Sequence, residues 1–193
     1  MSKPPKSGHT RWLLLALGLT CAWALFLTFF GPKGPRGDLA PPILEPQTLT
    51  SVADYAWRLE GLDGKPVDFG RFRGRAVFLN IWATWCPPCL DELPAIANLA
   101  ANPRLKDVAF LCASTHDDPE VLRRFLAGHA WKFPVARATS LPPAFQTAGI
   151  PATFLIAPDG KIVATQLGPA QWDAPDVVDL LERLARAGTA AKR

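Results

Sequence analysis

The chain has 193 residues, of which 49% are hydrophobic and 20% are charged, and its net charge is +4 at pH 7. This length fits one folded domain with an appendage, and this composition excludes an intrinsically disordered chain. The basic residues are scattered rather than gathered on one coherent face, so we expect no nucleic-acid partner.

The N-terminal region predicts a membrane anchor. Residues 12–30 contain no charged residue, and about twenty apolar residues are enough to span the hydrocarbon core of a bilayer. Residues 1–11 carry Lys3, Lys6 and Arg11, and the positive-inside rule places such a tail in the cytoplasm. We therefore expect a single-pass protein of the cell (inner) membrane, whose remaining chain faces the periplasm or the outside.

A cleaved signal peptide is the alternative interpretation of the same segment. Ala22-Trp23-Ala24 fits the small-x-small pattern of a cleavage site. Five of the next six residues, 25–30, are apolar, where a processed chain normally turns polar, and they favour the uncleaved anchor.

The segment after the anchor has the composition of a linker. Residues 31–47 contain five prolines and three glycines, which predicts a semi-extended chain that holds a folded domain away from the membrane. We place the folded domain at residues 48–188 and a disordered tail at residues 189–193.

The folded domain is expected to begin with a β-hairpin. Residues 56–62 can form one strand, Asp63-Gly64 is a strong turn signal, and residues 66–69 can return as a short edge strand.

Apolar runs then alternate with helical patterns along the rest of the domain. Residues 76–82, 108–113 and 152–157 read as buried strands, and residues 161–167 as an antiparallel return. Helices are expected after residue 86, from Pro119, and from Pro175 with Asp173 as a cap. This order predicts an α/β domain with a mixed central sheet that is flanked by helices and covered on both faces.

Two of the four cysteines have a recognisable local geometry. Cys21 lies in the apolar N-terminal run and Cys112 in a predicted buried strand, whereas Cys86 and Cys89 stand where a buried strand ends and a helix begins. The partial positive charge of a helix N-terminus favours a thiolate, so the pKa of Cys86 should be lowered. Cys89 follows within the first turn, close enough to form a disulfide with Cys86.

Such a pair can exchange disulfides in two steps. The Cys86 thiolate attacks a partner's disulfide, and Cys89 then attacks the Cys86 sulfur and releases the reduced partner. A zinc site built on this CxxC would need two further ligands from a second CxxC or from a pair of histidines. His116 and His129 are thirteen residues apart and do not have the spacing of such a pair. An inert structural disulfide is disfavoured because closing so short a loop stabilises a fold little.

The motifs around this pair resemble the thioredoxin superfamily. The resemblance is carried by Trp82-Ala83-Thr84-Trp85-Cys86-Pro87-Pro88-Cys89 and by Gly149-Ile150-Pro151-Ala152-Thr153-Phe154-Leu155-Ile156. Together with Glu92, Pro94, the Asp63-Gly64-Lys65 hairpin and the anchor, they are similar to the TlpA-like/ResA-like branch of extracytoplasmic thiol–disulfide proteins. The resemblance implies a thioredoxin-like fold over about residues 56–187.

The resemblance also implies roles for single residues. Cys86 would be the nucleophile and Cys89 the resolving thiol of a redox-active disulfide. Pro151 would be a cis-proline facing the pair, and the Ile150 backbone would pair with an extended client segment, as in strand addition. The alternative is that Pro151 is a trans proline at the start of a strand, with a purely structural role.

Asn80 departs from ordinary thioredoxins, which have a buried aspartate at the corresponding place. Glu92 is the candidate replacement, because it lies one helical turn after Cys89 and burial would raise its pKa towards neutrality. A solvated Glu92 that complements the helix dipole is the alternative.

The remaining residues near the pair divide between client binding and core packing. Trp85, Pro87 and Pro88 would join Ile150 and Pro151 in contacting clients. Trp82 is expected in the core, and Cys112 as a buried free thiol.

The resemblance implies an oxidoreductase that reduces protein disulfides without a cofactor or a metal. Its clients would serve cytochrome c maturation or oxidase copper-site assembly, and its electrons would come from a membrane-embedded thiol donor. Two other functions remain open: a copper-delivery module that uses the CxxC with His116, and a thioredoxin-fold peroxidase. The peroxidase is disfavoured, because Thr84 precedes Cys86 by two residues where the peroxidase motif requires three.

Overall fold

The computed structural model describes residues 39–46 and 52–190 of the chain. The predicted membrane anchor, residues 12–30, lies outside these residues. Within the described residues no helix combines the length and the apolar character needed to cross a bilayer.

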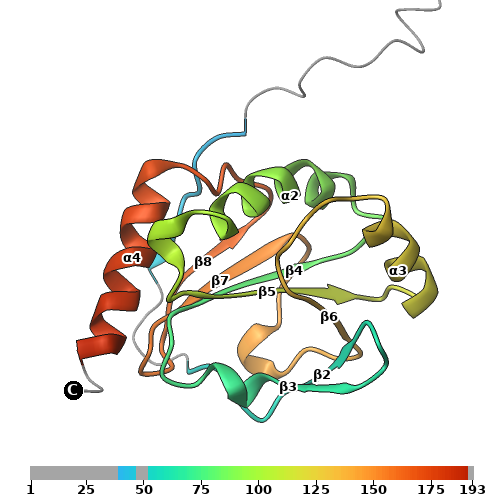
Figure 1. Cartoon of the computed structure of the whole chain (residues 1–193), viewed down its shortest axis with the longest axis horizontal. Coiled ribbons are helices and arrows are strands. Elements are labelled where there is room, and N and C mark those ends of the chain that lie inside the picture. The colour runs from blue at the N-terminus through green and yellow to red at the C-terminus, as the bar shows by residue number, and fades with distance from the viewer. Residues whose placement is uncertain (1–38, 47–51, 191–193) are drawn as a thin grey trace, which may run out of the picture. The chain divides into compact units, whose positions relative to one another are not determined.

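The described residues form one mixed sheet of eight strands in the order β1-β8-β7-β4-β5-β6-β2-β3 (Figure 1). The strands are β1 (Glu45–Pro46), β2 (Arg58–Gly61), β3 (Pro66–Asp68), β4 (Val77–Trp82), β5 (Ala109–Thr115), β6 (Val135–Ala138), β7 (Ala152–Ile156) and β8 (Ile162–Leu167). The helices are α2 (Pro87–Ala100), α3 (Pro119–Ala127) and α4 (Pro175–Ala190), with 3-10 turns η1 (Phe69–Phe72), η2 (Pro103–Leu105) and η3 (Pro143–Phe145).

Strand β4 is the centre of the sheet, and it positions the cysteine pair. It runs parallel to β5 and antiparallel to β7, and all six of its residues are buried. Its side chains alternate between the two faces of the sheet, as the pleat of a strand requires. Phe78 and Trp82 join the core cluster that contains residues of α2 and α4, whereas Leu79 joins the cluster that contains residues of η1 and η3.

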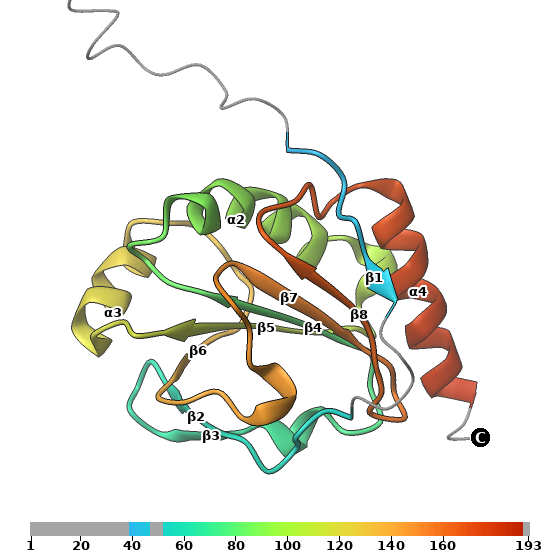
Figure 2. The same cartoon turned by 180° about the vertical axis from the view of Figure 1, so that it is seen from behind.

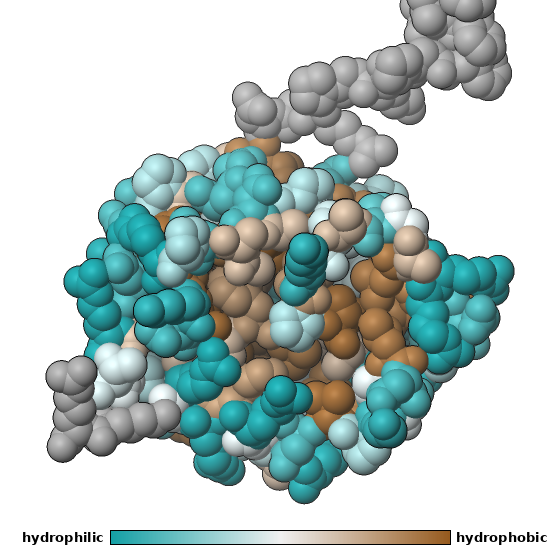
Figure 3. All heavy atoms as spheres, in the orientation of Figure 1, coloured by the Kyte–Doolittle hydropathy of each residue, from teal (hydrophilic) through white to brown (hydrophobic). Residues whose placement is uncertain are grey.

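The two faces of the sheet are therefore covered by different elements. Figures 1 and 2 show α2 and α4 over one face and η3 over the other, while β2 and β3 continue the sheet itself at one edge. In the view of Figure 3, apolar residues gather in the middle of the visible face and hydrophilic residues surround them. The mixed α/β thioredoxin-like architecture expected from the sequence is confirmed.

Three details differ from the sequence-based expectations. Residues 31–47 were expected to form a linker, but Glu45 and Pro46 form strand β1, which pairs with β8. This pairing covers the backbone groups of β8 that would otherwise lie at a free edge of the sheet. Strand β6 was not expected at all. Helix α4 extends to Ala190, so the first two residues of the tail expected to be disordered, 189–193, are helical.

Candidate active site

The cysteine pair lies at the junction between β4 and α2. Cys86 is the N-cap residue of α2 and has extended backbone angles, with φ −96° and ψ 101°. Cys86 and Cys89 form a disulfide with a Cα–Cα distance of 5.3 Å. Cys112, the other cysteine in the described part of the chain, is free and buried.

The helix start is unusual because both of its first two residues are prolines. Pro87 and Pro88 have no backbone N–H, so two of the donors that a helix N-terminus normally offers are missing. The Cys89 N–H takes over this function and donates to Cys86 Sγ at 3.3 Å. A thiolate at Cys86 would be stabilised through this contact.

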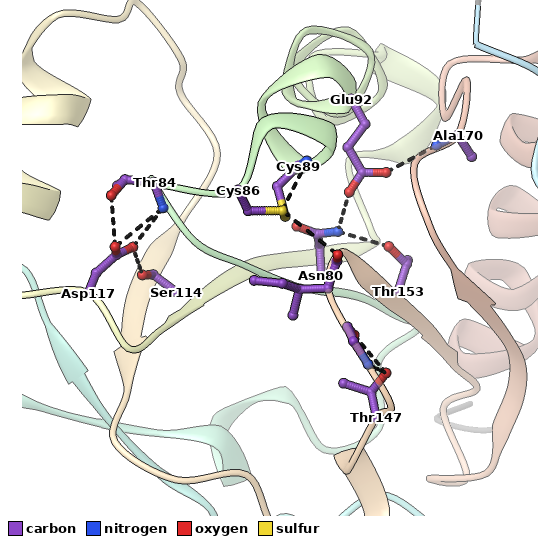
Figure 4. The surroundings of a disulfide bond; sticks show 12 residues. Asn80, Thr84, Cys86, Cys89, Glu92, Ser114, Asp117, Thr147, Thr153 and Ala170 are labelled. Atoms are coloured by element: carbon purple, nitrogen blue, oxygen red, sulfur yellow. Dashed lines mark hydrogen bonds between the residues drawn. A yellow bond between two sulfur atoms is a disulfide. The ribbon is translucent and has the colours of Figure 1, made fainter.

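The peptide bond between Ile150 and Pro151 is cis, and it faces the pair. Cys86 Sγ lies 3.8 Å from the carbonyl oxygen of Ile150 (Figure 4). Pro151 itself is buried and Ile150 is half-buried. The backbone at residue 150, rather than the proline ring, is therefore what this loop offers next to the sulfur.

Exposure differs sharply between the residues of the motif. Cys86 is 4% exposed and Cys89 is fully buried, so Cys86 is the sulfur closer to solvent. Trp85 is 61% exposed, which is high for an indole side chain, whereas Trp82 is fully buried as expected. Pro87 is exposed and Pro88 half-buried, so Trp85 and Pro87 offer the larger surfaces beside the pair.

Glu92 is fully buried and sits in a cage of hydrogen-bond donors. Asn80 Nδ2 donates to Glu92 Oε1 at 2.8 Å. Trp172 Nε1 and the Ala170 N–H donate to Glu92 Oε2 at 2.7 Å and 3.2 Å. Burial raises the pKa of Glu92 to about 7, although these three hydrogen bonds act in the opposite direction. The carboxyl group can therefore gain or lose a proton near neutral pH.

The loop that leads into Cys86 is tied to β5. Asp117, which is 4% exposed, accepts hydrogen bonds from the backbone N–H of Thr84 at 3.0 Å and from the Thr84 hydroxyl at 2.7 Å (Figure 4). The hydroxyl of Ser114 also donates to Asp117. These bonds fix the chain two residues before the first cysteine.

The comparisons with known proteins agree with this geometry. The sequence profile of the family described as Redoxin matches residues 36–181. The chain belongs to the Redoxin family. A relative from Bacillus subtilis, named thiol-disulfide oxidoreductase ResA, is 32% identical to this redoxin over 112 residues. The match covers 57% of the present chain and 63% of the relative, so it spans less than two thirds of the length of that relative.

Two further proteins extend the comparison. A protein from Bacillus thuringiensis (strain Al Hakam) with the same name is 31% identical over 160 residues, which are 81% of the redoxin and 84% of that protein. A solved structure of a secreted Mycobacterium tuberculosis disulfide oxidoreductase, described as homologous to E. coli DsbE, has a TM-score of 0.55 and 25% identity. It covers 69% of the redoxin and 99% of that chain.

Several residues around the site of the redoxin were not found by sequence reasoning. Trp172 and Ala170 lie in the loop between β8 and α4, about eighty residues after Glu92, and Asp117 follows β5. The sequence did offer one indication of the role of Trp172. A tryptophan in a short polar loop is usually held in place by a hydrogen bond from its indole N–H.

The copper-binding alternative is not supported by the geometry of the redoxin. Over residues 39–46 and 52–190, no group of three or more His, Cys, Asp and Glu side chains is placed to hold a metal ion. His116 is exposed, and its Nδ1 lies 2.8 Å from the hydroxyl of its neighbour Thr115. Cys86, Cys89 and His116 are therefore not assembled into one ligand set in this structure.

Proposed function

We propose that this redoxin is a thiol–disulfide oxidoreductase that reduces disulfides of client proteins through Cys86 and Cys89. The proposal rests on one observation above all: the disulfide lies at the N-terminus of α2 with the Ile150 carbonyl beside it. The names of the two Bacillus relatives support the same reaction class.

Cys86 acts first in the proposed reaction. Its sulfur caps α2, is the more exposed of the pair and accepts the Cys89 N–H, so its thiolate is the stabilised one. The thiolate attacks one sulfur of a client disulfide, forms a mixed disulfide and releases the other client sulfur as a thiolate. An extended client segment would pair with the backbone at Ile150 and contact the exposed Trp85.

Cys89 completes the reaction. After losing its proton, the Cys89 thiolate attacks the Cys86 sulfur, re-forms the internal disulfide and releases the second client sulfur. Glu92 is the proposed base that accepts this proton. Its pKa of about 7 lies close to neutral pH, and a general base is most effective when its pKa is near the pH of the reaction. A thiol donor then returns two electrons to the pair.

The setting of this reaction is part of the proposal. The uncharged segment 12–30 would anchor the domain in the cell membrane, facing the periplasm or the outside. There, disulfides form and need reduction. Proteins of cytochrome c maturation or of oxidase copper-site assembly would be the clients, and a membrane-embedded thiol protein the electron donor.

Trapping of mixed disulfides in cells tests this proposal. A full-length Cys89→Ser variant cannot resolve the intermediate, so clients should remain bound to Cys86 and be released by dithiothreitol. The double variant Cys86→Ser/Cys89→Ser should trap none, and Cys89→Ser/Cys112→Ser should trap as much as Cys89→Ser. Equal trapping by the double variant at residues 86 and 89 would contradict the proposal.

A further inference from the structure

Asn80 has a buried oxygen atom without a hydrogen-bond partner. The side chain is fully buried on β4, and its Nδ2 donates to Glu92 Oε1 at 2.8 Å and to Thr153 Oγ1 at 2.9 Å. Asn80 Oδ1 has no partner. A buried acceptor left unpaired costs free energy, so such an atom calls for an explanation.

While Glu92 is ionised, turning the amide over does not remove this cost. A carboxylate has no hydrogen to donate, so the group that faces an ionised Glu92 must be the amide nitrogen. The oxygen is then fixed on the opposite side of the amide. In the view of Figure 4 the nitrogen of the Asn80 side chain is turned towards Glu92 and Thr153, and its oxygen is turned away from them, in the direction of the cysteine pair.

The redox state decides whether this oxygen can find a donor. In the oxidised protein both sulfurs belong to the disulfide and carry no hydrogen. Reduction by two electrons breaks the S–S bond and, with the uptake of one proton, gives one thiolate and one thiol. Cys86 caps a helix and is favoured as a thiolate, whereas the fully buried Cys89 is favoured as a neutral thiol with an S–H donor.

We propose that Asn80 is a positioning residue that accepts the Cys89 S–H in the reduced protein and thereby favours the reduced state. The inference rests on the proposed function and adds to it a contribution to the direction of electron flow. In the oxidised state the unpaired oxygen destabilises the protein, and in the reduced state the same oxygen is paired. The amide also links the two partners of the proton transfer, because its nitrogen holds Glu92 while its oxygen holds Cys89.

A redox titration with glutathione at pH 8, where Glu92 is ionised, tests this role on the full-length protein. Two glutathione thiols supply the two electrons and become glutathione disulfide. Asn80→Leu removes the oxygen, so half-reduction should require a ratio of [GSH]² to [GSSG] about ten times higher than in the wild type. For a two-electron couple this tenfold change is about 30 mV towards more negative potential.

Two further variants separate this role from a general disturbance of the core. Asn80→Asp keeps an oxygen towards the sulfurs, and since two carboxyl groups in contact share one proton, it should stay within about threefold of the wild type. Cys112→Ala removes a buried thiol paired in register with Asn80 on β5, and it should stay within about twofold. Asn80→Ala, which introduces no bulk, replaces Asn80→Leu if that variant does not fold, with the same tenfold expectation.

The outcomes are distinct from those that test the proposed function. A wild-type pair that cannot be reduced and reoxidised would contradict the proposed function itself. A wild type that titrates normally, together with an Asn80→Leu or Asn80→Ala midpoint within twofold of it, would overturn the role of Asn80 alone. An equal shift in Cys112→Ala would overturn it as well, because the effect would then be one of packing.

Discussion

Trp172 Nε1 donates a hydrogen bond of 2.7 Å to Glu92 Oε2, and this contact joins the loop before α4 to the second turn of α2. Both side chains are fully buried. The hydrogen bond favours the ionised carboxylate, whereas burial favours the protonated acid. Burial is the stronger of the two effects, since the pKa of Glu92 is raised from 4.5 to about 7.

Replacing Trp172 by Phe should raise the pKa of Glu92 further. Phe keeps most of the ring packing against Phe78 but removes the N–H donor. Hydrogen bonds to charged groups contribute about 1.5–3 kcal/mol, so we expect a rise of about one to two pH units. The measurement is the pH profile of the step in which Cys89 resolves a preformed mixed disulfide.

This profile should have a midpoint near pH 7 in the wild type and a higher one in Trp172→Phe. Glu92→Gln should lack the midpoint altogether, because it has no carboxyl group to titrate. Trp131→Phe is the matched control: Trp131 is half-buried and stacks on His129, and its replacement should leave the profile unchanged. An unchanged profile in Glu92→Gln would exclude Glu92 as the base.

The raised pKa of Glu92 also predicts how stability depends on pH. Between pH 4.5 and about 7 the folded protein holds a proton on Glu92 that the unfolded chain has lost. The free energy of unfolding therefore falls as pH rises through this window, by about 3 kcal/mol from this group alone, and the cost is fully present above it. Urea unfolding of wild type and Glu92→Gln across this range checks the sign. A wild-type stability that rises relative to the variant would contradict it.

The prolines at the start of α2 predict that the pKa of Cys86 can be lowered by mutation. Pro88 stands at the second helical position, where an N–H could reach the side chain of the N-cap residue Cys86. Pro88→Ala restores this donor, and an added hydrogen bond of about 0.5–1.5 kcal/mol should lower the pKa of Cys86 by about half a unit to one unit. The rate of Cys86 alkylation against pH measures it. Pro94→Ala, later in the same helix, should leave this pKa in place.

The hydrogen bonds from Thr84 to Asp117 predict that the loop after β5 influences the reactivity of Cys86. Asp117→Ala leaves the N–H and hydroxyl of Thr84 and the hydroxyl of Ser114 without their acceptor, and it should lower the free energy of unfolding by about 1–3 kcal/mol. It should also change the alkylation rate of Cys86, because the chain two residues earlier loses its anchor. Asp118→Ala, which removes the cap of α3, should cost about 1 kcal/mol without changing that rate.

The sequence predicted the features that local patterns determine. The apolar run at residues 76–82 indicated the central strand, and the spacing of Glu92 from Cys89 indicated a buried acid near the pair. Trp172 was missed because its partner lies eighty residues away and no periodicity connects them. Strand β6 was missed because it has four residues that are only alternately buried, and long-range pairing with β5 and β2 defines it.

The most direct test of the central claim follows the reaction of reduced full-length protein with a disulfide-containing peptide, resolved by mass. The wild type should reduce the peptide and end with the Cys86–Cys89 disulfide, and Cys89→Ser should stop at one mixed disulfide per molecule. Cys86→Ser should react with the peptide at least a hundred times more slowly, because the buried Cys89 is a poor first nucleophile. A Cys86→Ser variant that forms mixed disulfides as fast as the wild type would contradict the account.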